Sequence, residues 1–289
     1  MMYTVLFRKG FAIIFVFTLL IVFAAPETSP AIDLGLIEPG ELSQTLSAWT
    51  LLDARPKKEW RAGHIPGAVS FSWEDYTRTD EKGIPYRTLP PEQLAEALGK
   101  SGIDENTPLV VYGDADTSWG GEGWACWVFD WIGHQGKVRL LNGGIQSWTG
   151  QGLAVKSGQT NSSKTTSVYH YQAHPLVNIT ADGLRKDPSA YRIVDTRSTL
   201  EWIKGRIPGA VHISWEKFFS GKNRNPIGRS ELRTLLARDN IDPDMTVVYY
   251  CTGGIRSGYA WLVHVLSGFS SPVNFEGGIE EWNKTVQPE

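Results

Sequence analysis

Short hydrophobic runs alternate with segments of helical spacing along most of this chain. The runs 109–112 and 246–250 are rich in Val and Tyr, which is typical of strands buried on both faces of a sheet. In segments 91–99 and 229–238, hydrophobic residues recur every three or four positions, which predicts amphipathic helices. Strands that alternate with helices usually pair in parallel, so the pattern predicts an α/β fold with central, mostly parallel sheets flanked by helices.

The first 31 residues differ from the rest of the chain. Arg8 and Lys9 precede an unbroken apolar run from Phe11 to Ala25. A basic start followed by such a run predicts a secretory signal peptide, and the run is shorter than the about 20 residues that a spanning helix needs. The alternative is an uncleaved N-terminal anchor. Both readings of residues 1–31 predict an exported protein of the periplasm or another extracytoplasmic space, with membrane association only through this segment.

The chain contains an internal repeat whose blocks keep the same order in both halves. The matched blocks are 51–55 with 193–197, 59–60 with 201–202, 63–68 with 205–210, 71–73 with 213–215, 110–112 with 247–249, and 142–148 with 276–282. We therefore predict two tandem α/β domains, 36–153 and 176–289. The connecting segment 154–175 is expected to be a linker, because its stretch Lys156–Ser167 contains no apolar side chain.

The repeated motifs together resemble the rhodanese family. They are Asp-x-Arg, Glu-Trp, Gly-His/Arg-Ile-Pro-Gly-Ala, a strand followed by a loop and a helix, and Gly-Gly-Ile-x-x-Trp. The resemblance covers nearly all of the chain after the N-terminal segment. It implies two small α/β domains, each with a central parallel sheet, and a sulfurtransferase or a catalytically inactive relative. In tandem members of the family, usually only the C-terminal domain is active.

Cys251 directly follows the predicted strand 246–250 and precedes Gly253, Gly254 and an apolar helical segment, Tyr259–Leu266. Backbone N–H groups converge in a glycine-rich loop at the start of a helix, and Arg256 adds a full positive charge. These features favour the thiolate, which is the nucleophilic form of cysteine. They also suit the outer sulfur of a persulfide and an oxyanion leaving group. Cys251 is therefore the predicted catalytic residue, with the donor-binding loop formed by Thr252, Gly253, Gly254, Ile255, Arg256 and Ser257.

The other cysteine, Cys126, lies in the apolar segment Trp124–Phe129. A buried, inert thiol is expected there, and a disulfide with Cys251 is not. Aligning the repeats places Asp114 opposite Cys251. A carboxylate cannot attack sulfane sulfur and repels anionic donors, so we predict that the first domain is non-catalytic and covers one side of the active site.

The spacing of Arg256 distinguishes two chemistries. Related cysteine phosphatases carry Cys-x5-Arg, whereas here Arg256 follows Cys251 after four residues. The shorter loop favours sulfur over a tetrahedral phosphate. In thiosulfate-specific tandem rhodaneses two basic residues follow the cysteine, whereas this chain has Thr252 and Gly253. Those rhodaneses also carry an arginine a few residues after the Asp-x-Arg motif that binds the donor. The residue at that position in this chain is Glu201.

Other residues are expected to play supporting parts. Arg256 is the only charged side chain of the loop and the best candidate to bind the donor. Asp195 and Arg197 are expected to hold the end of a strand against its neighbouring loop. The histidines form no metal set, and no glycine-rich nucleotide loop is present.

The formal net charge of −3 and the pI of about 6.1 argue against a nucleic-acid partner. The partners expected are a small sulfur-containing anion as donor and a thiophilic acceptor such as cyanide or a thiol, without metal or organic cofactor. Two hypotheses are open: an enzyme that transfers sulfane sulfur through a Cys251 persulfide, and a periplasmic carrier that hands polysulfide sulfur to a respiratory or sulfur-oxidising partner. An inactive interaction module is disfavoured by the intact loop at Cys251.

Overall fold

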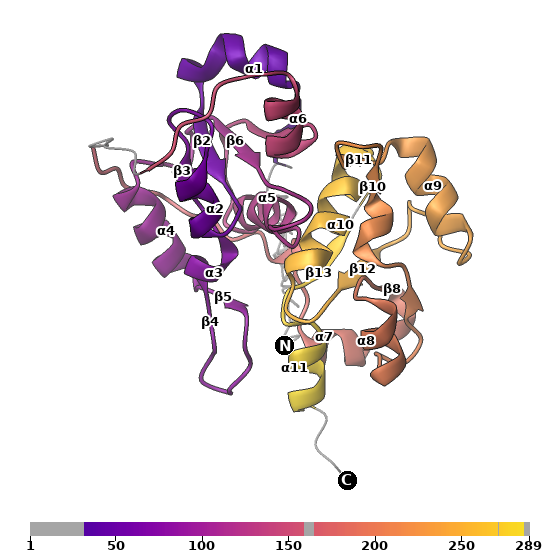
Figure 1. Cartoon of the computed structure of the whole chain (residues 1–289). Coiled ribbons are helices and arrows are strands. Elements are labelled where there is room, and N and C mark those ends of the chain that lie inside the picture. Colours follow the sequence, from indigo (N-terminus) through magenta and orange to yellow (C-terminus); the bar gives the residue numbers. More distant parts are fainter. Residues whose placement is uncertain (1–31, 159–164, 271, 286–289) are drawn as a thin grey trace, which may run out of the picture. The chain divides into compact units, whose positions relative to one another are not determined.

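Each repeat is organised by one parallel sheet, and Figure 1 shows the two sheets with their helices. The computed structural model describes residues 32–158, 165–270 and 272–285. The predicted signal peptide or anchor, residues 1–31, lies outside the described residues. In the described part of the chain, no helix is long and apolar enough to cross a membrane.

The first sheet has the strand order β1-β7-β6-β2-β3, and all its pairs are parallel. Its strands are β1 (Leu34–Ile37), β2 (Thr50–Asp53), β3 (Val69–Ser70), β6 (Leu109–Tyr112) and β7 (Val138–Leu141). The helical segments around it are α1 (Pro39–Thr45), η1 (Leu46–Ala48), α2 (Lys57–Ala62), α3 (Trp73–Tyr76), α4 (Pro91–Lys100), α5 (Gly121–Trp131) and α6 (Gly144–Gly150). A small antiparallel hairpin of β4 (Thr77–Arg78) and β5 (Arg87–Thr88) stands apart from the sheet.

The second sheet has the order β13-β12-β8-β9 and is also parallel throughout. Its strands are β8 (Arg192–Asp195), β9 (Val211–His212), β12 (Val247–Tyr250) and β13 (Val273–Phe275). The helical segments are η2 (Pro175–Val177), α7 (Ala181–Lys186), η3 (Pro188–Ala190), α8 (Thr199–Lys204), η4 (Trp215–Phe218), α9 (Arg229–Ala237), α10 (Ile255–Leu266) and α11 (Gly278–Thr285). Its small antiparallel hairpin consists of β10 (Phe219–Ser220) and β11 (Asn225–Pro226).

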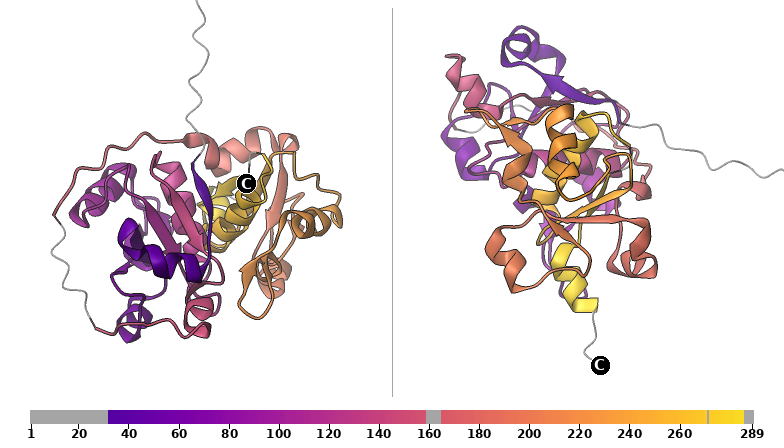
Figure 2. Two further views of the ribbon diagram at one scale, coloured as in Figure 1. Left: turned by 90° about the horizontal axis from the view of Figure 1, so that it is seen from above. Right: turned by 90° about the vertical axis from the view of Figure 1, so that its right-hand side faces the viewer.

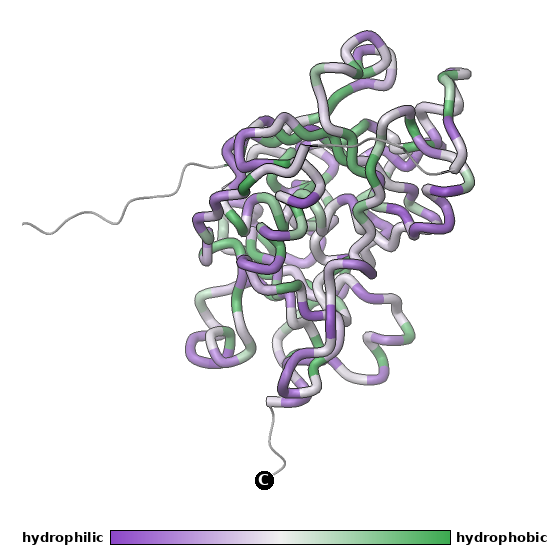
Figure 3. Tube along the Cα trace, turned by 90° about the vertical axis from the view of Figure 1, so that its left-hand side faces the viewer, coloured by the Kyte–Doolittle hydropathy of each residue, from purple (hydrophilic) through white to green (hydrophobic). Residues whose placement is uncertain are grey.

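The α/β fold predicted from the hydrophobic pattern is confirmed. The run 109–112 is β6 and the run 246–250 contains β12, both fully buried. The predicted helix 91–99 is α4, which continues one residue further, to Lys100, and 229–238 contains α9. Hydrophobic stretches are interspersed with hydrophilic ones along the trace in Figure 3, as expected where buried strands alternate with half-buried helices.

Helices α5 and α10 pack against each other and join the two repeats into one compact unit. The left panel of Figure 2 shows the yellow helix α10 between the strands of the two sheets. Two glycines allow the close approach. A Cβ atom on Gly123 would lie 2.3 Å from the Cα of Tyr259, and one on Gly258 would lie 2.8 Å from the Cα of Trp124. A single buried cluster therefore includes hydrophobic residues of both repeats.

The segment predicted to be a linker is described in part. Residues 156–158, which end the first described stretch, contain no helix or strand apart from an isolated bridge between His64 and Lys156. Further on, Tyr169 is buried, and its hydroxyl lies 3.0 Å from Nδ1 of His134. The connection thus packs along the first domain at this point.

Candidate active site

Cys251 lies at the point where β12 ends and the loop to α10 begins. The residue is 1% exposed, and its carbonyl accepts a hydrogen bond from the N–H of Ile279 at 2.9 Å. Gly254 ends the loop as the N-cap of α10 with a φ of 82°. A Cβ atom there would lie 2.7 Å from the carbonyl oxygen of Glu276, so both the conformation and the space require glycine. The turn therefore fixes the thiol directly in front of the helix N-terminus.

The loop offers its backbone to an anion. Within the described chain, none of the N–H groups from Thr252 to Ser257 donates a hydrogen bond to a nitrogen or oxygen of the protein. The helix that follows has 12 residues, and the partial positive charge of its N-terminus acts at the same place. A negatively charged sulfur on Cys251, or an oxyanion beside it, would meet these donors.

Arg256 reaches back over the loop but is held by a carboxylate. Its Nη1 and Nη2 donate to the two carboxylate oxygens of Glu201 at 2.8 and 2.7 Å, and Nη2 also donates to Oγ1 of Thr252 at 2.8 Å. These bonds from Arg256, with further bonds from Ser198, hold the pKa of Glu201 well below its ordinary value. Burial opposes the charge of Arg256, yet Glu201 and the sulfur of Cys251 raise the pKa of its guanidinium. Arg256 is therefore charged beside the sulfur, and much of that charge is balanced by Glu201.

Ser257 and Asn274 form a polar pair behind the sulfur. The Ser257 hydroxyl oxygen lies 3.7 Å from Sγ of Cys251 and 2.6 Å from Oδ1 of Asn274. Asn274 donates through Nδ2 to the carbonyl of Gly254 at 3.1 Å, which turns its Oδ1 toward Ser257. The hydroxyl has one proton, which it can donate to Oδ1 of Asn274 or to the sulfur of Cys251, and an ionised sulfur is the charged acceptor of the two. The sequence analysis does not predict a role for Asn274. The feature that could have indicated one is a polar residue inside the buried strand β13.

Asp195 and Arg197 lie behind the loop and do not line its cavity. Nη2 of Arg197 donates to Asp195 and to the carbonyl of Gly205, both at 2.6 Å. The hydroxyl of Tyr250 donates to Asp195 at 2.6 Å and accepts from the N–H of Ile207 at 3.2 Å. The structure thus ties the end of β8 to the end of β12 and to the following loop.

A cavity of about 490 Å³ opens in front of Cys251. Its lining from the second domain is Glu201, Cys251, Thr252, Gly253, Ile255 and Arg256. Its lining from the first domain is Trp73, Glu74, Tyr86 and Trp119. The prediction that the first domain covers one side of the site is confirmed, whereas the residues that do so were not identified from the sequence.

The β4–β5 hairpin carries Tyr86 across to the second domain. Arg87 forms an ion pair with Glu276 at 3.0 Å and another with Glu281, and the N–H of Thr88 donates to Glu276 at 2.5 Å. These contacts join the two domains next to the loop. The hairpin that lines the cavity is therefore anchored to the second domain, which contains Cys251.

The first domain has no thiol at the corresponding place. Asp53 pairs with Tyr112 in the first sheet, and Asp195 pairs with Tyr250 in the second. Tyr112 therefore corresponds to Tyr250. The residue opposite Cys251 is Gly113, and the alignment that placed Asp114 there was wrong by one position. The match by sequence sets Tyr112 against Tyr249, whereas the strand pairing sets Tyr112 against Tyr250.

The rest of the first-domain loop is also altered. Ser257 and Asn274 correspond to Glu122 and Leu140, which line a cavity of only about 20 Å³ with Gly113. Glu122 accepts a hydrogen bond from Ser118 at 2.6 Å, and burial raises the pKa of Glu122. This loop offers no nucleophilic sulfur, which agrees with a non-catalytic first domain.

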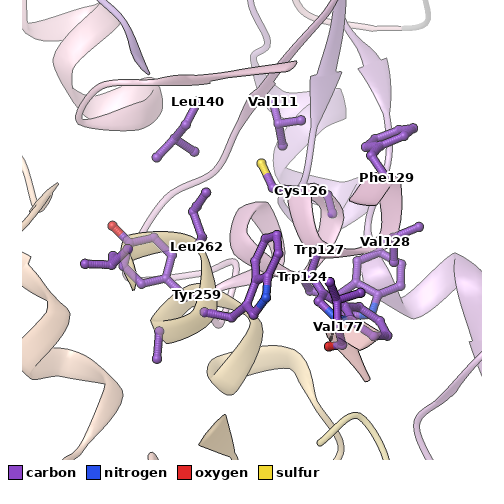
Figure 4. Close-up of a cluster of buried hydrophobic side chains, with 14 of the residues drawn as sticks. Val111, Trp124, Cys126, Trp127, Val128, Phe129, Leu140, Val177, Tyr259 and Leu262 are labelled. Atoms are coloured by element: carbon purple, nitrogen blue, oxygen red, sulfur yellow. Dashed lines mark hydrogen bonds between the residues drawn. The ribbon is translucent and has the colours of Figure 1, made fainter. Parts of the chain in front are cut away.

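Cys126 is buried in the apolar interior, as predicted. Figure 4 shows its sulfur among hydrophobic side chains that include Val111 and Leu140. Burial raises the pKa of this thiol far above its usual range. Both cysteines are free, and Cys126 is 0% exposed. Among the described residues, no group of three or more His, Cys, Asp or Glu side chains could hold a metal ion.

Comparison with known proteins gives two matches to one family model, described as the rhodanese-like domain, at residues 38–151 and 180–285. SseA of Mycobacterium tuberculosis is 33% identical over an alignment of 249 positions that covers 78% of this chain and 78% of that protein. The thiosulfate sulfurtransferase of Corynebacterium glutamicum is 27% identical, covering 78% of each chain. The human 3-mercaptopyruvate sulfurtransferase is 27% identical, covering 86% of this chain and 88% of that one.

Among solved structures, the anaerobic ergothioneine biosynthesis enzyme from Chlorobium limicola superposes with a TM-score of 0.78. It covers 88% of this chain and 69% of that chain, at 23% sequence identity. This likeness is one of fold.

Proposed function

Because the chain belongs to the rhodanese family, we propose that it moves sulfane sulfur through a persulfide on Cys251. The protein is a sulfurtransferase. The observation that supports the role of Cys251 is its position at the start of the loop before α10, where the N–H groups 252–257 donate no hydrogen bond to nitrogen or oxygen of the described residues. The corresponding residue of the first domain is a glycine, so only one domain can carry sulfur in this way.

In the first half-reaction, the Cys251 thiolate attacks the outer sulfur of thiosulfate or a similar donor. An S–S bond forms to Cys251, the S–S bond of the donor breaks, and sulfite leaves with the electron pair. The loop N–H groups stabilise the negative charge on the departing oxyanion and on the outer sulfur of the persulfide. Arg256 contributes less than a free arginine would, because Glu201 accepts two of its hydrogen bonds.

In the second half-reaction, cyanide or a thiol attacks the outer sulfur. The S–S bond of the persulfide breaks, and Cys251 leaves as a thiolate into the same cradle. Ser257, oriented by Asn274, is the nearest hydroxyl to that sulfur. Each step uses protein groups and substrates alone.

We further propose that the protein acts outside the cytoplasm. The basic Arg8–Lys9 and the apolar run from Phe11 to Ala25 support export. The mass of the protein recovered from its native host tests the proposal. A mature form that begins after the apolar run is expected for a signal peptide. A full-length protein in the soluble cytoplasmic fraction would contradict export.

Steady-state kinetics with thiosulfate and cyanide test the sulfurtransferase mechanism. A covalent relay predicts ping-pong kinetics and thiocyanate as product. Cys251→Ser is expected to abolish turnover, whereas Cys126→Ser is expected to retain it. Formation of the persulfide without turnover would identify a carrier rather than an enzyme. Turnover by Cys251→Ser would contradict the mechanism.

A further inference from the structure

The cavity in front of Cys251 is much larger than a small inorganic sulfur donor requires. Its volume of about 490 Å³ lies within the range of pockets that bind small organic molecules. Trp73, Tyr86 and Trp119 line it from the first domain, and the rings of Trp73 and Tyr86 meet edge to face with centroids 6.1 Å apart. The two rings form a corner, and Trp119 adds a third aromatic surface.

Two of these aromatic residues stand on strained backbone. Tyr86 has a φ of 63° and Trp119 a φ of 56°, in the left-handed region that bulky residues rarely adopt. Both side chains nevertheless stay largely accessible, with Tyr86 41% and Trp119 55% exposed. Strain of this kind is typical of ligand sites, where the exposed side chain has a use that folding alone does not explain.

The charges around the cavity have an acidic balance. Its charged lining is Glu74, Glu201 and Arg256, and the last two are bound to each other. Glu74 forms no ion pair within the described part of the chain. Lys57 and Lys58 do not line this cavity but an adjoining cleft that shares Glu74 and Trp119 with it.

We propose that Trp73, Tyr86 and Trp119, together with Glu74, bind the cationic group of an organic thiol that accepts sulfur from Cys251. Aromatic faces attract ammonium groups, quaternary ones included, and a neighbouring carboxylate adds to the attraction. A dianion gains no such attraction from the aromatic wall that Trp73, Tyr86 and Trp119 form.

This inference rests on the proposed persulfide. The acceptor thiol gives its proton to the outer sulfur and attacks that sulfur as a thiolate. A new S–S bond forms to the acceptor, and the old S–S bond breaks with its electron pair on Cys251. The products are the acceptor persulfide and the Cys251 thiolate, so atoms and charge balance. The cationic end would lie on the aromatic wall while the thiol reaches the sulfur.

Three thiols of similar size test the proposal: thiocholine, which is cationic, 2-mercaptoethanol, which is neutral, and 2-mercaptoethanesulfonate, which is anionic. Persulfide-loaded full-length protein is mixed with each thiol, and the second-order rate of sulfur loss is expressed per thiolate. Thiocholine is expected to react roughly tenfold or more faster than 2-mercaptoethanesulfonate, as one to two cation–π contacts would give.

Trp119→Ala is expected to reduce this ratio several-fold, and Glu74→Gln to reduce it less. Tyr171→Ala is the matched control, because Tyr171 is an exposed aromatic residue that binds Glu92 and does not line the cavity. Equal rates for the three thiols, or an unchanged ratio in Trp119→Ala, would overturn the inference.

The same loaded protein is treated with cyanide in parallel. Release of thiocyanate together with equal thiol rates overturns the cationic acceptor alone. Absence of thiocyanate from the loaded protein would overturn the proposed persulfide itself, and this inference with it.

Discussion

Tyr86 of the first domain lies against Gly253 of the second so closely that a Cβ atom on residue 253 would come within 2.5 Å of the Tyr86 Cβ. The space that a side chain at position 253 would need is thus filled by the other domain. This explains why the loop after Cys251 lacks a basic residue there. The first domain, which has no thiol at the corresponding place, thus restricts which side chains the loop after Cys251 can carry.

Gly253→Ala is expected to destabilise the protein by about 1–3 kcal/mol, because the added methyl group overlaps the Tyr86 side chain. In the double variant with Tyr86→Ala, most of this loss should be recovered. Urea unfolding of the four proteins measures the coupling. Gly150→Ala is the control, since an added Cβ there meets nothing within 4 Å. Strictly additive effects of the two substitutions would contradict the contact.

The ion pair of Glu201 with Arg256 predicts a pH dependence of stability. The folded-state pKa of Glu201 lies below its ordinary value of 4.5, chiefly because Arg256 donates to it. The pair therefore contributes fully above pH 4.5, and its contribution is lost as the pH falls through the folded-state pKa. Glu201→Gln should flatten this decline and lower the free energy of unfolding at neutral pH.

Glu59, the counterpart of Glu201 in the first domain, provides the control. It approaches only the exposed Lys58, at 3.8 Å, within the described residues. Glu59→Gln is therefore expected to leave the pH dependence almost as it is in the unaltered protein. Denaturant unfolding across the acidic range compares the three proteins, and a parallel decline for all of them would contradict the role of the pair.

Asn274 is predicted to position Ser257 beside the sulfur. Asn274→Leu copies Leu140 of the first domain, and it should slow persulfide formation by about tenfold, the worth of one hydrogen bond. Ser257→Ala should have a similar effect, and the double variant little more than either alone. Stopped-flow rates with saturating donor separate this effect from binding. A change in KM alone, or additive losses, would show that Asn274 serves only the packing of the loop.

The fold and the thiol could be predicted from the sequence because both depend on local patterns. Buried runs and the repeat led to the α/β domains, and the glycine-rich loop after β12 led to Cys251. The match of Asp114 with Cys251 failed because Tyr249 and Tyr250 are adjacent, so the run could be aligned in two ways. The correct register depends on a contact in space, the bond of the Tyr250 hydroxyl with the N–H of Ile207.

The aromatic wall could not be predicted in the same way. Trp73, Tyr86 and Trp119 are far apart in the sequence, and they meet at Cys251 only because the first domain packs against the second. The balance of Arg256 by Glu201 likewise depends on how α8 lies beside the loop. Contacts between elements that are far apart in the sequence leave no periodic pattern along the chain, so they could not be predicted from it.

The most direct measurement of the central claim locates the sulfur atom. The full-length protein is incubated with thiosulfate, digested without reductant, and its cysteine peptides are weighed by mass spectrometry. A mass increase of one sulfur atom on the peptide with Cys251, lost on addition of cyanide, is the predicted result, with the Cys126 peptide unchanged. An increase confined to Cys126, or no increase with thiosulfate or 3-mercaptopyruvate as donor, would contradict the persulfide on Cys251.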